Sequence, residues 1–150
     1  MNGAYYTQKK GEGQRPRVGL PFSVTTYFMV GLGGAFGAMA RHAVNSVVHQ
    51  RILSARFPWS IFAINVAGSF VIGLLGGLLA SERLTWGYPV RSFVIVGILG
   101  GFTTFSSFSF DTLALAREGF PLQALWNVVG QVGLSLLAVW IGFYVGLSKT

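Results

Sequence analysis

The sequence lacks cysteine and contains little charge. Only 10% of its 150 residues are charged, with four acidic residues against eleven Lys and Arg. Without cysteine, disulfides and thiol catalysis are excluded. Soluble domains carry about 25% charged residues, whereas this chain is 52% hydrophobic and has a mean hydropathy of +0.58. The composition therefore places the chain among membrane proteins.

The net charge of +7 could suggest a nucleic-acid-binding protein. The basic residues are instead scattered over the N-terminal segment and the connections between apolar stretches, as expected at membrane surfaces. No zinc spacing, P-loop or nucleic-acid motif is present. His42 and His49 have no evident metal-binding partner in the sequence, and no base and nucleophile are arranged for catalysis. We therefore expect neither nucleic acid as a partner nor an enzyme.

Four apolar stretches are long enough to cross a bilayer, which takes about 20 residues. They cover about residues 24–43, 59–80, 93–116 and 122–147. Residues 1–21 are polar and predict a flexible tail; cleavage as a signal peptide is disfavoured because three further spans follow. The sequence predicts an all-α integral membrane protein with one four-span domain, 22–150. Four spans are few helices to enclose a pathway, which favours an oligomer.

The third span has an unusual middle. Gly100-Gly101 and Thr103-Thr104 are followed by Ser alternating with Phe as far as Phe110. The glycines lower the cost of leaving helical geometry, and lipid cannot satisfy freed backbone groups. The pattern predicts a helix that is broken near the bilayer centre, with carbonyls able to hold a cation. Alternatively, the glycines only let helices pack closely.

Polar side chains also interrupt the other spans. Asn65 either bonds a neighbouring helix or offers amide hydrogens to an anion. Asn127, Gln131 and Ser135 are spaced four apart, so they share a helix face that should meet protein or a pathway. Arg41 either snorkels to the interface or attracts anions at a pore mouth.

The distribution of basic residues gives a weak orientation signal. With four spans, one side holds Lys9, Lys10, Arg15, Arg17, Arg83, Arg91 and Lys149, and the other holds Arg41, Arg51, Arg56 and Arg117. Much of the excess comes from the N-terminal segment, so the positive-inside bias is small. A small bias permits insertion in both orientations. An antiparallel pair would bring two central breaks together, because inversion preserves the depth of the midplane.

These residues carry a family resemblance. The stretch Gly100-Gly101-Phe102-Thr103-Thr104-Phe105-Ser106-Ser107-Phe108-Ser109-Phe110 strongly resembles the signature of the Fluc (CrcB) fluoride channels. The glycine-rich first span ending in Arg41-His42, and Asn65-Val66-Ala67-Gly68-Ser69-Phe70, look like the same family. The resemblance covers about residues 24 to 147. It implies a dual-topology, antiparallel homodimer with two fluoride pathways and one central structural sodium ion.

The resemblance also implies roles for individual residues. Sodium would be held by the backbone carbonyls of Gly100 and Thr103. Phenylalanine rings have electropositive edges that solvate an anion weakly. The implied fluoride pathway consists of Asn65, Phe105, Phe108, Ser107, Asn127, Gln131 and Ser135, and Arg41 corresponds to the family's first-span arginine. One departure is Asp111, where the family would have Glu.

We therefore predict a passive fluoride channel of the cell inner membrane that lets cytoplasmic fluoride leave. One alternative is a small dual-topology multidrug exporter. That class needs an intramembrane carboxylate, which the first span lacks and Asp111 is badly placed to supply. The other alternative is a non-transporting interaction subunit, which leaves the polar stripe and the hydroxyl run without a purpose.

Overall fold

The computed structural model describes residues 23–51 and 56–148, and this part of the chain is helical without any strand. The predicted tail, residues 1–21, lies outside the described residues. The elements are α1 (Val24–Arg51), α2 (Trp59–Ala80), α3 (Tyr88–Arg91), the π-helical η1 (Ser92–Leu99), α4 (Gly100–Phe102), α5 (Phe105–Arg117) and α6 (Pro121–Leu147). The predicted all-α class is thus confirmed.

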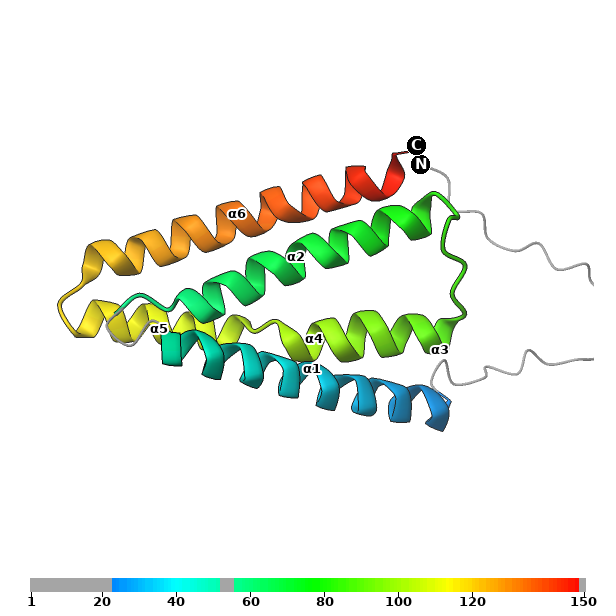
Figure 1. Ribbon diagram of the computed structural model, residues 1–150, viewed down its shortest axis with the longest axis horizontal. Coiled ribbons are helices and arrows are strands. Elements are labelled where there is room, and N and C mark those ends of the chain that lie inside the picture. Colours follow the sequence, from blue (N-terminus) through cyan, green and yellow to red (C-terminus); the bar gives the residue numbers. More distant parts are fainter. Residues whose placement is uncertain (1–22, 52–55, 149–150) are drawn as a thin grey trace, which may run out of the picture.

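The helices form two pairs of parallel partners. α2 packs along α6, and both run in the same direction (Figure 1). α1 packs along η1 and α4, and these run in the opposite direction to α2 and α6 (Figure 1). Contacts of α5 with α6 join the two pairs. The interrupted segment from α3 to α5 therefore meets both α1 and the α2/α6 pair.

Glycines bring the paired helices into backbone contact. A Cβ atom added at Gly73 would lie 2.2 Å from the Val139 carbonyl oxygen, and one at Gly142 would lie 2.3 Å from that of Phe70. In the other pair, a Cβ at Gly37 would lie 2.1 Å from the carbonyl oxygen of Ile98. No side chain fits at these positions, which confirms that these glycines permit close helix contact.

Within residues 23–51 and 56–148, three helical stretches are long and apolar enough to cross a membrane. They are Trp59–Ala80, Tyr88–Arg117 and Pro121–Leu147. α1 has 28 residues but is not among them, and it carries Arg41, His42, His49 and Arg51. It also continues eight residues beyond the predicted end of the first span at residue 43.

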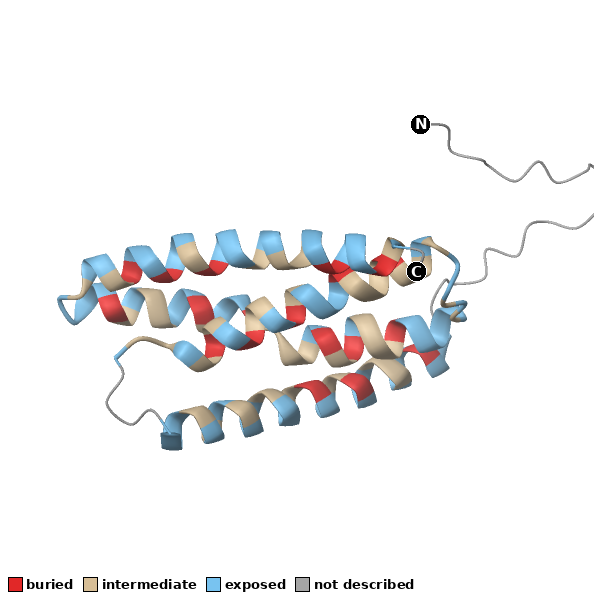
Figure 2. Ribbon diagram, turned by 45° about the horizontal axis from the view of Figure 1, so that its top comes forward, coloured by how far each residue is buried: buried red, intermediate tan, exposed pale blue. Residues whose placement is uncertain are grey.

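Large apolar side chains lie mostly on the outside of the bundle. The buried apolar cluster consists of Ile61, Ile64 and Phe108. In contrast, the outward face of α6 is exposed along its length, with buried residues confined to the side that meets α2 and α5 (Figure 2). Such a surface suits an apolar surrounding, because lipid takes the place of a large buried core.

The break in the span Tyr88–Arg117 lies after the glycine pair, between α4 and α5. Gly100 is helical, with φ −64° and ψ −36°. The chain leaves helical geometry at Thr103 (φ −80°, ψ 157°) and Thr104 (φ −155°, ψ 116°). Gly101 is needed for packing instead, because a Cβ there would lie 2.6 Å from the Gly34 carbonyl oxygen. The interruption predicted for the Gly/Thr stretch is therefore present, and it falls at the two threonines rather than at the glycines.

Candidate functional site

The break is fixed by the side chain of Asn65 on α2. Its Oδ1 accepts a hydrogen bond from the Thr104 N–H at 2.9 Å, and its Nδ2 donates to the Thr104 carbonyl at 3.1 Å. Asn65 therefore satisfies both backbone groups of a residue that has left the helix. Its second amide hydrogen goes to Oε1 of Gln131 on α6. Both donors of Asn65 are thus engaged.

The polar stripe of α6 extends these bonds into a hydrogen-bonded ladder. Gln131 donates to Asn127 Oδ1 at 3.1 Å, and Asn127 donates to the Thr112 hydroxyl on α5 at 2.8 Å. The Thr112 hydroxyl donates to the Phe108 carbonyl at 2.7 Å. Asn127 and Gln131 are only 0% and 3% exposed, which confirms that the stripe faces protein. We call this set, with Asn65 and Thr104, the amide ladder.

Thr104 also caps helix α5. Its hydroxyl oxygen accepts from the Ser107 N–H at 3.2 Å and donates to the Ser107 hydroxyl at 3.2 Å. A side chain that accepts from the third helical N–H is the usual way to begin a helix. The Thr104 hydroxyl oxygen also lies 3.1 Å from that of Ser106. Restarting the helix at Phe105 therefore depends on Thr104.

The carbonyl groups of Gly100 and Thr103 lose their helical partners at the break. In a continuous helix the Gly100 carbonyl would accept from the Thr104 N–H, and the Thr103 carbonyl from the Ser107 N–H. Here these N–H groups donate to Asn65 Oδ1 and to the Thr104 hydroxyl. The carbonyls of Gly100 and Thr103 are the two predicted to hold a cation. A hard cation such as sodium prefers oxygen ligands, so the donor type fits.

A cavity of about 400 Å³ lies beside the break. Its wall comes from α2, η1, the break and α6. The polar lining residues are Asn65, Ser69, Thr103, Thr104, Gln131 and Ser135. The remaining lining residues are Gly68, Ile72, Ile95, Leu99, Gly100, Phe105, Phe108, Val132 and Leu136. This lining contains neutral donors and two aromatic rings but no charged side chain.

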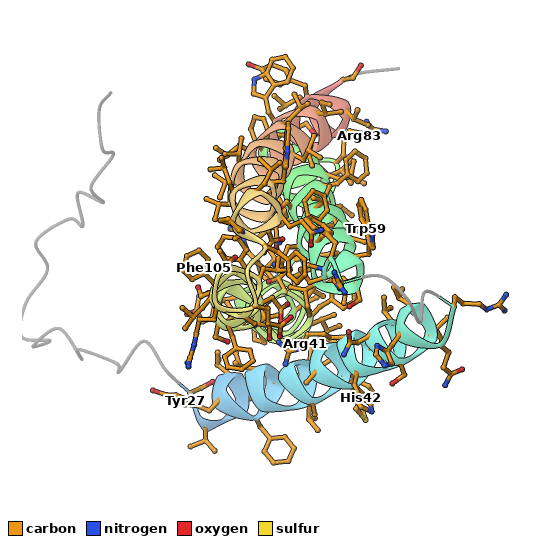
Figure 3. The ribbon with its side chains drawn as sticks, turned by 90° about the vertical axis from the view of Figure 1, so that its left-hand side faces the viewer. Tyr27, Arg41, His42, Trp59, Arg83 and Phe105 are labelled. Carbon is orange, nitrogen blue, oxygen red and sulfur yellow. The ribbon has the colours of Figure 1, made fainter. Side chains whose placement is uncertain are left out.

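The two phenylalanines differ in their surroundings. Their ring centroids are 5.2 Å apart with planes at 50°. Phe108 is buried at 7% exposure against Ile61 and Ile64, whereas Phe105 is 76% exposed and projects from the side of the bundle (Figure 3). Phe108 is therefore held by its own chain, and Phe105 is not.

The structure brings most predicted site residues together but not all. Gly100, Thr103, Asn65, Phe105, Phe108, Gln131 and Ser135 line the cavity. Asn127 and Ser107 stand behind this wall, bonded to Gln131 and Thr104. Arg41 does not line the cavity; it lies on the side of α1 turned toward α4 and α5, opposite His42 (Figure 3).

Thr112 and Ser69 were missed in the sequence. Thr112 falls four residues after Phe108, so the two share one face of α5. Ser69 falls four residues after Asn65. In both cases the spacing from a predicted site residue was a usable signal.

Comparison with known proteins identifies the family. Residues 28–143 match the family described as "CrcB-like protein, Camphor Resistance (CrcB)". The chain belongs to the CrcB family. Together with the three helices able to cross a membrane, this membership makes it a multi-pass membrane protein.

Curated relatives of this CrcB chain have a common name. A protein of Opitutus terrae, "Fluoride-specific ion channel FluC", is 47% identical over 84% of this chain and 97% of its own length. Proteins with the same name from Paramagnetospirillum magneticum and from a strain of Thermus thermophilus are 49% and 43% identical. They are aligned over 78% and 82% of this chain and over 91% and 94% of the relatives. All three are named as ion channels and not as enzymes.

Proposed function

We propose that this chain is a passive, fluoride-specific channel of the cytoplasmic membrane that lets fluoride leave the cell. The observation that carries the proposal is the uncharged cavity at the break, which is lined by amide and hydroxyl groups and by the rings of Phe105 and Phe108. The names of the CrcB relatives support fluoride as the ion.

The lining suits a small anion that must also leave again. Fluoride is strongly hydrated, so a narrow path has to replace its water with hydrogen-bond donors. Neutral donors and aromatic edges do this without binding the ion as tightly as a fixed Lys or Arg would. No lining residue in the described part of the chain is charged, which is consistent with conduction rather than storage.

The proposal includes four membrane crossings in each chain. α1 supplies the fourth crossing, because it runs parallel to η1 and α4 (Figure 1). It contacts them through Gly33 and Gly37. Its charged residues, Arg41 and Arg51, fall in its second half, where Arg41 would serve a pore mouth.

We further propose an antiparallel homodimer with two pathways. Phe105 lines the cavity yet is 76% exposed, so a single chain leaves this side of the wall incomplete. A second copy would cover it. Oppositely accessible C-termini in one membrane preparation would support inverted copies, and uniform accessibility would contradict them.

The proposed dimer would hold one structural sodium ion. The carbonyls of Gly100 and Thr103, freed from their helical N–H donors, would be the ligands. Two carbonyls alone are few ligands for a cation, so the same pair from an inverted copy would complete the site. When bound, the ion would join the copies and offset repulsion between anions. Replacing sodium by N-methylglucamine should weaken the dimer on size-exclusion chromatography.

The deciding experiment is ion efflux from liposomes that hold the purified protein. A fluoride electrode should record rapid fluoride loss, while a chloride electrode on matched liposomes records none. The loss should need no proton gradient. A reconstituted dimer that releases neither ion would contradict the proposal and favour a non-transporting subunit.

A further inference from the structure

We propose that Arg56, stacked on the ring of Phe120, binds the phosphate group of an anionic phospholipid. The guanidinium carbon of Arg56 lies 4.5 Å from the centre of that ring. Arg56 lies just before α2, and Phe120 directly precedes α6, so the contact joins the two connections from which these helices start. Such a lipid site is independent of which ion the chain conducts.

The starts of the two helices place this contact at the level of the lipid headgroups. The stretches able to cross a membrane begin here at Trp59 and at Pro121. α2 and α6 pack side by side and run in the same direction, so both begin at the same end of the bundle (Figure 1). Residues just before such stretches lie where the apolar core of a bilayer meets its headgroups. Arg56 and Phe120 therefore lie beside the phosphate groups of the surrounding lipid.

Three aromatic rings hold the segment that carries Arg56 against the bundle. The ring centroids of Phe57 and Trp59 are 4.6 Å apart, and that of Phe62 lies 5.6 Å from the first and 6.0 Å from the second. Phe62 packs over α6, because a Cβ atom added at Gly130 would lie 3.2 Å from its ring. Trp59 is still 50% exposed, which suits a side chain with an apolar ring and a polar N–H at a membrane surface.

The stacking orients Arg56 but leaves its hydrogen-bond donors free. Within residues 23–51 and 56–148, the Arg56 side chain makes no hydrogen bond or ion pair. A ring covers only one face of a guanidinium, so the N–H groups point outward in its plane, where their spacing matches two oxygens of a phosphate. Arg83, beyond the far end of α2, differs because it already donates to the Ser148 carbonyl at 2.9 Å.

The charge at this end favours an anionic lipid over a zwitterionic one. The charged residues nearest in sequence to the starts of α2 and α6 are Arg51, Arg56, Arg117 and Glu118, so cations outnumber anions. Basic residues at a membrane surface attract anionic headgroups. The phosphate of phosphatidylcholine is balanced by its own ammonium group, whereas that of phosphatidylglycerol is not. Phosphatidylglycerol is therefore the better partner for this arginine.

The experiment measures lipid binding to the purified full-length protein in a neutral detergent by native mass spectrometry. Short-chain phosphatidylglycerol is compared with phosphatidylcholine of the same chains. Arg56→Gln removes the charge, and Phe120→Leu removes the ring but keeps the charge. Arg51→Gln is the matched control, because it removes an equal charge at the end of α1, where no ring contact is present within the described residues. Arg83→Gln is a second control, and the unfolding midpoint of every variant is first measured without lipid.

The unmodified protein should bind phosphatidylglycerol more tightly than phosphatidylcholine. Arg56→Gln should weaken phosphatidylglycerol binding about tenfold, as for losing hydrogen bonds to a charged partner. Phe120→Leu should weaken it less, and the two control variants should bind as the unmodified protein does.

Three results would overturn this lipid site. Equal binding of the two lipids to the unmodified protein would show that the charge of the headgroup is not read. A loss in Arg51→Gln as large as that in Arg56→Gln would show attraction by diffuse surface charge in place of a site. Displacement of the bound lipid by inorganic phosphate would assign the arginine to a free anion.

Discussion

The side chain of Asn65 pairs with the backbone of Thr104 as a neighbouring β-strand would, accepting at 2.9 Å and donating at 3.1 Å. An amide is suited to this because it presents one acceptor and a donor group in a single plane. The pairing lets the third helix stop and restart inside an apolar protein. It also makes Asn65 a structural residue of the cavity as well as a candidate ion contact.

Asn65→Asp should abolish fluoride efflux and lower stability. The carboxylate still accepts the bond from the Thr104 N–H. Its second oxygen replaces the Nδ2 donor, however, and faces two acceptor oxygens, the Thr104 carbonyl and Gln131 Oε1. Its negative charge would also repel anions. We expect a destabilisation of about 1–3 kcal/mol, measured as a lower midpoint of thermal unfolding in detergent. Asn45→Asp is the control, because Asn45 is exposed and only its oxygen is bonded, to Ser60. Normal efflux in Asn65→Asp would remove Asn65 from the pathway.

Thr112→Val should weaken the amide ladder at its far end. Valine has the same shape but no hydroxyl, so the buried amide of Asn127 loses its acceptor. An unsatisfied buried donor costs about 1–3 kcal/mol, which thermal unfolding should detect together with slower efflux. Thr112→Ser keeps the hydroxyl and should behave nearly as the unmodified protein. Equal stability of the valine and serine variants would contradict a role for this bond.

Gly37→Ala should disrupt the packing of α1 on η1. The added methyl group would lie 2.1 Å from the Ile98 carbonyl oxygen, which belongs to backbone and cannot turn away. Overpacking of this kind costs about 1–3 kcal/mol, again read from thermal unfolding. Gly31→Ala on the same helix meets nothing within 4 Å and should be neutral or slightly stabilising. Equal effects of the two substitutions would contradict this packing.

Phe105→Ile and Phe108→Ile should separate conduction from folding. Phe105 makes little contact with its own chain, so its replacement should slow fluoride efflux while leaving the unfolding midpoint unchanged. Phe108 packs against Ile61 and Ile64, so its replacement should lower both. The loss of packing for Phe108 is on the order of 1–2 kcal/mol. Unchanged efflux in Phe105→Ile would exclude that ring from the pathway.

The sequence predicted the helices better than the details of the break. α2 has the predicted bounds, 59–80, because Pro58 and the end of the apolar run mark them clearly. The Gly/Thr stretch predicted a break but not which of its residues would leave the helix, because glycine only reduces the cost of irregular backbone. Its position is decided by a partner 39 residues away, since Asn65 bonds Thr104. Local sequence does not contain such a long-range contact.

For the polar residues of α6, too, the sequence predicted the position on the helix but not the bonding partners. Their four-residue spacing predicted a common face, and Asn127 and Gln131 do lie buried on it. The spacing did not indicate their order of bonding or their attachment to Thr112. Those depend on how α5 and α6 approach each other, which is set by packing across the bundle.

The amide ladder begins at the Thr104 N–H and ends at the Phe108 carbonyl, so the backbone of α5 closes it into a ring through α2 and α6. A ring of fixed circumference behaves as a rigid linkage. Sliding α6 by a single residue, about 1.5 Å, would break bonds at both of its attachments. We therefore expect this wall of the cavity to move as one unit, with α2, α5 and α6 keeping their register beside it.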